Sequence, residues 1–276
     1  MLEFLKKNYL FTIWLVAFLV LTFLKVSFGW IFLGTLVYLL LVLLLRLPRT
    51  VFTLGYLLQG GGKEATSRKM YEWAYKKGAR VGAPMIAYGM MLLKNSEYPE
   101  GLKVLQDVLL VPKLNPNFLK VVRQDLSIAY YKNGDLETAI STLELMLEEY
   151  EFFSGDFYTT LGYFYIEAGD YEKAREINER ALKEDASCGA AYDNLALIEY
   201  EQGRPEEAEE LFLKALELKD TMVSSKYYLG LIAEQKGDAD AAADYFTAAH
   251  GGTITGLNTI TREQVDAKYD EYCLNG

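Results

Sequence analysis

GDFYTTLGYFYIEAGDYEKAREINERALKEDA at residues 155–186 is followed by GAAYDNLALIEYEQGRPEEAEELFLKALELKD at residues 189–220, and the second stretch repeats the pattern of the first. The two copies are offset by 34 residues, and residue types that are identical or similar in size recur at this spacing. The aligned pairs are Tyr158 with Tyr192, Leu161 with Leu195, Gly162 with Ala196, Gly169 with Gly203, Ala174 with Ala208 and Ala181 with Ala215. A fixed period of this length is typical of helical solenoids, in which each helix pair buries its apolar face against its neighbours. The sequence therefore predicts an all-α fold.

Further copies of the pattern extend the array in both directions. Repeats begin near residues 82, 120, 155, 189 and 223, so that the array occupies residues 82–250. Small residues recur where the two helices of a pair must approach closely, as Gly162 and Ala174 do in one repeat. Asn178 stands at a position that is large and apolar in other repeats. Because a buried amide without a partner is unfavourable by about 1–3 kcal/mol, we expect Asn178 to find a hydrogen-bonding partner.

This order of small, apolar and aromatic residues resembles the tetratricopeptide repeat (TPR) family over residues 82–250. The resemblance implies a right-handed α-solenoid whose first helices line a concave groove that binds extended or helical peptides. Mapped onto this sequence, the groove positions are Gln124, Ile128, Tyr131, Asp156, Thr159, Tyr163, Glu167, Asp193, Asn194, Leu197, Tyr200, Glu201, Tyr227, Leu231 and Glu234. The tyrosines offer a large contact area, and the carboxylates favour a protein or peptide partner with basic residues. Asn194 has both a donor and an acceptor for a peptide backbone.

The same positions indicate which ligands the groove disfavours. The related TPR proteins that bind the C-terminal carboxylate of chaperones use Lys, Arg and Asn side chains for this purpose. Here the cationic positions hold Gln124, Asp156, Thr159 and Asp193, so the resemblance does not extend to that ligand class. The alternative to a peptide groove is an acidic inner face that is solvated and has no dedicated ligand.

The first 49 residues contain two apolar runs, residues 8–24 and 26–45, which are separated by Lys25. Each run is long enough for a helix that crosses the hydrocarbon core of a membrane. A cation at the membrane centre is unfavourable by about 2.5–3.5 kcal/mol, so we expect a bend near Lys25 and a transmembrane helical hairpin over residues 1–49. The alternatives are a cleaved signal peptide, although no A-x-A site follows the first run, and a single anchor with an interfacial helix.

The cations around the two runs predict their orientation. Lys6, Lys7, Arg46 and Arg49 lie on one side of the expected hairpin, and Lys25 alone lies on the other. Cytoplasmic loops carry the excess of lysine and arginine, so both termini are expected in the cytoplasm. We interpret the chain as an integral protein of a bacterial cell membrane.

Residues 50–81 are interpreted as a basic juxtamembrane linker and helix, with a flexible glycine joint at residues 60–62. The cations expected to contact anionic lipid are Lys63, Arg68, Lys69, Lys76, Lys77 and Arg80. One alternative is an ordinary solvated helix face. Another is the degenerate second helix of a repeat, because Ser67, Tyr71 and Ala74 have the small-aromatic-small spacing found further along the chain.

Residues 251–276 follow the array. The sequence Thr261-Arg-Glu-Gln264 is typical of a capping box, in which a threonine and a glutamine satisfy the first amides of a helix. A solenoid needs a terminal element to cover its last apolar face, so we expect a C-terminal capping helix here.

The composition argues against several classes of function. Residues 120–276 hold 14 cations and 32 anions, a balance that disfavours binding to nucleic acid. Cys188 and Cys273 lie far apart, and His250 is the only histidine, so the sequence predicts no metal site. No nucleophile with a base and no phosphate-binding loop is apparent, so we expect no catalytic residues, no cofactor and no enzyme activity.

The sequence thus predicts a membrane-anchored scaffold or adaptor that binds a protein or peptide partner on the cytoplasmic side. The alternative is an accessory subunit of a membrane enzyme or translocation complex, in which the hairpin makes the functional contacts. Residues 1–49 would contact membrane lipid in both cases. The sequence predicts neither the identity of the partner nor an oligomeric state.

Overall fold

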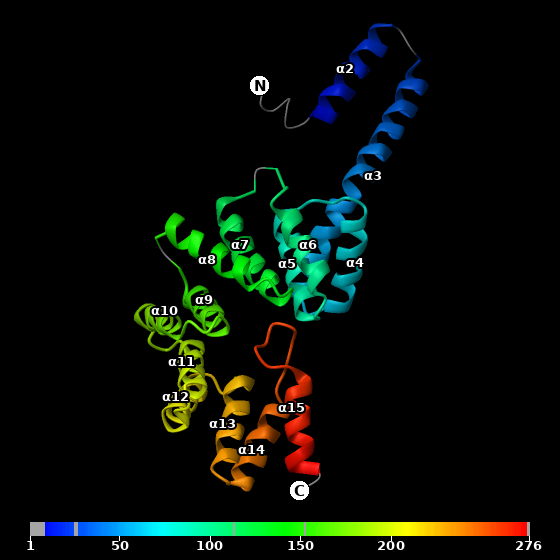
Figure 1. Cartoon of the computed structure of the whole chain (residues 1–276). Coiled ribbons are helices and arrows are strands. Elements are labelled where there is room, and N and C mark those ends of the chain that lie inside the picture. The colour runs from blue at the N-terminus through cyan, green and yellow to red at the C-terminus, as the bar shows by residue number, and fades with distance from the viewer. Residues whose placement is uncertain (1–8, 25–26, 113, 152, 275–276) are drawn as a thin grey trace. The chain divides into compact units, whose positions relative to one another are not determined.

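The computed structural model describes residues 9–24, 27–112, 114–151 and 153–274, and every regular element in these ranges is helical (Figure 1). The chain divides into two compact units, residues 1–85 and 86–276. The first unit contains α2 (Tyr9–Phe23), α3 (Phe28–Gly60) and α4 (Glu64–Lys76), and the boundary falls within α5 (Gly82–Lys94). The second unit continues with α6 (Tyr98–Val108), α7 (Pro116–Lys132), α8 (Leu136–Glu149), α9 (Gly155–Glu167), α10 (Tyr171–Glu184), α11 (Gly189–Glu201), α12 (Pro205–Leu218), α13 (Val223–Gln235), α14 (Ala239–His250), α15 (Arg262–Tyr269) and a π-helical turn (Asp270–Leu274).

The first unit contains the one described helix that is long and apolar enough to cross a membrane, Gly29–Gly60 within α3. The apolar stretch of α2, Thr12–Thr22, is shorter. Trp14 of α2 contacts α3, because its indole Nε1–H donates a hydrogen bond to Thr35 Oγ1 at 3.4 Å and its ring stacks on Tyr38. Lys6, Lys7 and Lys25, on which the predicted orientation depends, lie outside the described residues.

The last part of α3 forms a helix pair with α4. Phe52 and Tyr71 are fully buried with their ring centroids 5.3 Å apart, and the Tyr71 hydroxyl donates to Gln59 Oε1 at 2.8 Å. Gly62 has a φ of +75°, and it lies in a tight turn between the helices where a flexible joint was expected. The spacing of key residues in this pair matches that in a later repeat. Gly55, Gly62, Ser67, Tyr71 and Ala74 are spaced as are Gly162, Gly169, Ala174, Asn178 and Ala181. The pair therefore has the register of a further repeat.

The second unit confirms the predicted solenoid of helix pairs. Glycines allow the two helices of a pair to approach closely: a Cβ at Gly162 would lie 2.2 Å from Asn178 Nδ2, and one at Gly230 would lie 2.5 Å from the Phe246 ring. The pairs in this unit are α5 with α6, α7 with α8, α9 with α10, α11 with α12 and α13 with α14. Their first helices carry the residues predicted to face the groove.

Asn178 has the partner that the sequence required. Its side chain is fully buried, and its Oδ1 accepts a hydrogen bond from Asn194 Nδ2 at 2.8 Å. Its own Nδ2 donates to the Ala174 carbonyl at 2.8 Å. The amide therefore replaces the large apolar residue of other repeats without leaving its polar groups unsatisfied.

The predicted capping box is confirmed at the start of α15. Thr261 Oγ1 accepts from the Gln264 amide at 3.2 Å, and Gln264 Oε1 accepts from the Thr261 amide at 2.7 Å. Val265 is fully buried in the cluster that also contains Phe246, and Tyr272 packs against the Phe246 ring at 5.3 Å. The C-terminal element thus covers the apolar face of the last helix pair.

Candidate functional site

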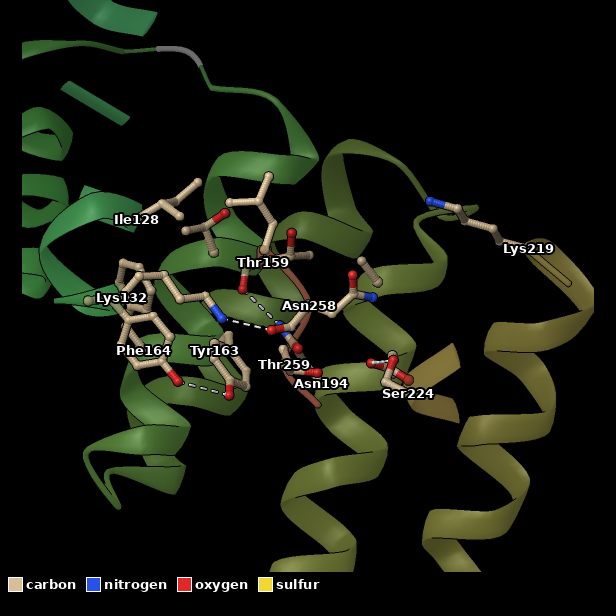
Figure 2. A pocket seen from close by; sticks show the side chains of 15 residues that line it. Ile128, Lys132, Thr159, Tyr163, Phe164, Asn194, Lys219, Ser224, Asn258 and Thr259 are labelled. Atoms are coloured by element: carbon tan, nitrogen blue, oxygen red, sulfur yellow. Dashed lines mark hydrogen bonds between the residues drawn. The ribbon is translucent and has the colours of Figure 1, made fainter. Parts of the chain in front are cut away.

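The concave face of the second unit holds a cavity of about 360 Å³ (Figure 2). Three first helices, α7, α9 and α11, supply most of its wall, and the start of α13 and the loop before α15 complete it. The lining residues are Ile128, Tyr131, Lys132, Thr159, Thr160, Tyr163, Phe164, Ala190, Asp193, Asn194, Lys219, Ser224, Leu257, Asn258 and Thr259. The first helices recur on one side of the solenoid because every repeat turns the chain by the same helix-turn-helix geometry.

Two tyrosines that line the cavity share a hydrogen-bonding partner, Glu167, which lies just outside its lining. The Tyr131 and Tyr163 hydroxyls lie 3.2 Å apart, and both donate to the Glu167 carboxylate, at 2.9 and 2.7 Å. Burial raises the pKa of Tyr131 to about 12 and also raises the pKa of Tyr163. Both phenols are therefore neutral donors at physiological pH, and the Glu167 carboxylate is satisfied within the chain.

Asp193 and Asn194 lie on the neighbouring first helix, α11. Burial raises the pKa of Asp193, against hydrogen bonds from the Ser225 and Ser224 hydroxyls that act to lower it. Asn194 Nδ2 donates to the Thr159 carbonyl at 2.8 Å (Figure 2) and to Asn178 Oδ1, also at 2.8 Å. The side-chain amide of Asn194 was predicted to bind a peptide backbone. Its donor group instead links adjacent repeats.

The structure brings some of the predicted groove residues to this cavity and places others elsewhere. The predicted residues that line it are Ile128, Tyr131, Thr159, Tyr163, Asp193 and Asn194. Those outside its lining are Gln124, Asp156, Glu167, Leu197, Tyr200, Glu201, Tyr227, Leu231 and Glu234.

The C-terminal part of the predicted groove is largely covered by the chain itself. Glu234 accepts a hydrogen bond from Lys268 Nζ of α15 at 2.7 Å, so the terminal element lies against α13. Tyr227 is 8% exposed and packs against Phe246, and Leu197 is also buried. Tyr200 accepts from Gln235 Nε2 at 3.0 Å. The repeat period carries no information about the side chains and the terminal element that cover these positions.

The predicted lipid-contacting cations lie in the first unit. Lys63, Lys69, Lys76 and Lys77 are exposed, whereas Arg68 and Arg80 are half-buried. Lys76 forms an ion pair with Glu72 at 2.6 Å within the same helix, and the Arg80 guanidinium lies over the Tyr75 ring at 4.7 Å. The four exposed lysines are therefore the members of this set that remain accessible to an anionic surface.

The sequence missed the segment that crosses the concave face. We call residues 253–260, which join α14 to α15, the strap. The Gly256 amide donates to the Lys94 carbonyl at 2.8 Å, the Tyr98 hydroxyl donates to the Gly256 carbonyl at 3.1 Å, and Lys132 Nζ donates to the Asn258 carbonyl at 2.7 Å. In Figure 1 this loop extends from the orange α14 and red α15 toward the first helices of the unit. No local signal predicts such contacts, because they join residues that are more than a hundred positions apart.

Comparisons with known proteins agree with this fold. A family model of the tetratricopeptide repeat matches residues 153–221, and a model of the PPR repeat matches residues 126–150. None of the curated protein sequences compared with the chain matches it.

Solved structures with similar folds include proteins described as TPR proteins. A thermophilic TPR protein of Thermus thermophilus is similar with a TM-score of 0.58 and 16% identity, over 70% of this chain and 100% of that one. PilW, described as a widely conserved type IV pilus biogenesis factor, has a TM-score of 0.58 and 13% identity, over 73% and 91%. A tetratricopeptide repeat protein of Parabacteroides merdae has a TM-score of 0.53 and 15% identity, over 81% and 97%. The paired helices and the repeat register agree with these matches: residues 153–221 carry tetratricopeptide repeats, and the described helices of the second unit form a TPR-type solenoid.

Proposed function

We propose that the protein is a membrane-anchored scaffold that binds an extended segment of a protein partner in the concave groove, on the cytoplasmic side. The observation that carries this proposal is the cavity between α7, α9 and α11, which has both an apolar wall and polar groups directed into it. Ile128, Phe164 and the tyrosine rings offer apolar area, while Thr160, Lys132 and Lys219 offer hydrogen-bonding groups. Peptide sites in proteins combine these two kinds of surface.

The membrane part of the proposal is supported by α3. An apolar helix of this length matches the thickness of a hydrocarbon core, and Arg46 and Arg49 follow its most apolar part. With those arginines in the cytoplasm, the helix pair that follows and the repeat array would lie on the same side. The exposed Lys63, Lys69 and Lys77 would then be available to anionic lipid headgroups.

The preference of the groove for a basic partner depends on which carboxylates remain accessible. Asp156 and Glu201 are exposed, whereas Glu167, Asp193 and Glu234 already accept hydrogen bonds from within the chain. We therefore assign the attraction for basic residues to the rim and to the acidic field of residues 120–276. Contacts inside the cavity would be made by neutral hydroxyls and by Lys132 and Lys219.

Blocking the groove tests this function. Ala190 is half-buried and lines the cavity, so Ala190→Arg would place a long cationic side chain in the space that a peptide needs. We expect at least a tenfold loss of the partner that co-purifies with the full chain from crosslinked membranes. The matched control is Ala186→Arg, an exposed position between α10 and α11. Equal recovery of the same partner by both variants, with equal helix content, would contradict the proposal.

A further inference from the structure

The strap is held at its base as a closed loop. The two terminal nitrogens of Arg262 donate to the carbonyls of His250 and Gly252, at 2.9 and 2.8 Å. These bonds join the end of α14 to the start of α15, so both ends of the strap are fixed. The middle of the strap reaches Lys94 of α5 and Lys132 of α7. The segment between them is therefore presented to the groove as an extended peptide would be.

The strap contacts the end of α5, Tyr98 and the cavity wall at Lys132 through its main chain. The three hydrogen bonds at its tip use the Gly256 amide, the Gly256 carbonyl and the Asn258 carbonyl. Figure 2 shows the bond from Lys132 to Asn258 across the middle of the cavity. A groove that binds main-chain groups can accept a different sequence with the same backbone path, which is how extended peptides are commonly bound.

One position of the strap has a strict requirement for size. Gly256 is buried, and a Cβ there would lie 2.2 Å from the Leu93 carbonyl oxygen and 2.9 Å from the Ser96 amide. Both neighbours are backbone atoms, which cannot move aside as a flexible side chain would. The end of α5 therefore leaves room only for glycine at this point of the segment that lies against it.

The side chains of Thr255 and Asn258 shape the strap itself, while Ile254 and Ile260 pack on the last helix pair. Asn258 Oδ1 accepts from the Thr255 amide at 2.8 Å and from the Thr255 hydroxyl at 3.2 Å. The Leu257 amide donates to the same hydroxyl at 3.3 Å. These bonds hold residues 255–258 in a turn that places Gly256 against the groove, and Leu257 and Asn258 beside the cavity.

The strap leaves much of the groove unfilled. In it, only Gly256 and Ile260 are buried, and the cavity persists between residues 257–259 and the helices. Segments with few buried apolar contacts are the ones that open at low free energy. A competing segment that also filled the cavity could therefore displace the strap without unfolding the solenoid.

We propose that the strap is an intramolecular ligand of the groove, and that the partner segment which displaces it carries glycine at the position of Gly256. This inference rests on the proposed function, because it names the chemistry of the segment that the groove binds. Without a partner, the strap supplies the main-chain groups that bond to Lys94, Tyr98 and Lys132. With a partner bound, the partner segment would supply these groups.

The test supplies the strap as a separate molecule. The probe is a fluorescent peptide with the sequence of residues 252–262, and the protein is the full chain in detergent with residues 254–260 replaced by a Gly/Ser linker of equal length. We expect saturable binding in fluorescence anisotropy, and binding to the unaltered chain at least about tenfold weaker, because a tethered segment competes at an effective concentration near millimolar. The control peptide carries Gly256→Val and should bind at least tenfold more weakly than the parent peptide.

Failure of the peptide to bind the linker variant, or equal binding to both chains, would overturn the inference. If the linker variant loses helix content, the full chain with Gly256→Val takes its place, because this substitution should detach the tip and leave the helices intact. The proposed function is tested separately by Ala190→Arg. If Ala190→Arg abolishes partner recovery but the peptide does not bind, only the proposal of an intramolecular ligand is contradicted. If the peptide binds but Ala190→Arg does not change partner recovery, the scaffold function is contradicted.

Discussion

A chain that begins at residue 47 is expected to be soluble and fully helical in buffer, whereas a chain that begins at residue 63 is expected to aggregate or to lose α4. The difference arises because the end of α3 packs on α4: Phe52 and Tyr71 are fully buried, and Gln59 accepts the Tyr71 hydroxyl. Removing residues 47–62 would expose Tyr71, and the loss of a buried aromatic contact is unfavourable by about 3–5 kcal/mol. Circular dichroism and size-exclusion chromatography would measure the difference.

The full chain in isolated membranes is the control for these truncations. It should stay with the membrane pellet after an alkaline wash, because α3 is then intact, while the chain that begins at residue 47 should be released. Equal thermal stability of the two truncated chains would show that residues 47–62 do not stabilise α4. It would also contradict the assignment of a further repeat to α3 and α4.

Phe246→Ala is expected to lower the free energy of unfolding of the repeat array by about 3–5 kcal/mol. Phe246 is fully buried between Tyr227 and Tyr272, and its ring fills the space that Gly230 leaves open. The cavity left by alanine would loosen both the last helix pair and the terminal element that covers it. Chemical denaturation followed by circular dichroism would measure the change.

Leu213→Ala is the matched control for this substitution. Leu213 lies on a second helix, α12, and is 43% exposed, so its truncation should change the free energy of unfolding by less than about 0.5 kcal/mol. A loss of under about 1 kcal/mol for Phe246→Ala would mean that the last repeat adds little to the array. The strap, whose base is fixed beside this repeat, would then lack a stable support.

The fold was predictable from the sequence because its determinants are local and repeated. The 34-residue period, the small residues at Gly162 and Ala174, and the capping box at Thr261 each have a physical meaning within one repeat. Even the exception at Asn178 could be anticipated, since a buried amide needs a partner, and Asn194 is that partner. The further pair formed by α3 and α4 was visible only as the spacing of Ser67, Tyr71 and Ala74, because the long apolar run of α3 obscures the pattern in that helix.

The candidate site was less predictable because it depends on contacts between distant segments. The period places Tyr163 and Asp193 on the inner face, but it gives no information about what lies opposite them. The strap reaches Lys94 and Lys132 by contacts that leave no periodic trace in the sequence. Likewise, the acidity of the groove was overestimated from the sequence, because Glu167, Asp193 and Glu234 turn out to be satisfied internally.

Photo-crosslinking in membranes tests directly whether the groove binds a partner segment in place of the strap. The photoreactive p-benzoylphenylalanine would replace Thr160, which lines the cavity, in the otherwise unaltered full chain. We expect two products, an internal crosslink to residues 257–259 and a crosslink to a second protein, and the yield of one should rise as the yield of the other falls. The same probe at Leu213, on the other helix of a repeat, should give neither. If the internal crosslink from Thr160 forms in full under every condition, and only the probe at Leu213 crosslinks a partner, then the partner does not displace the strap from the groove.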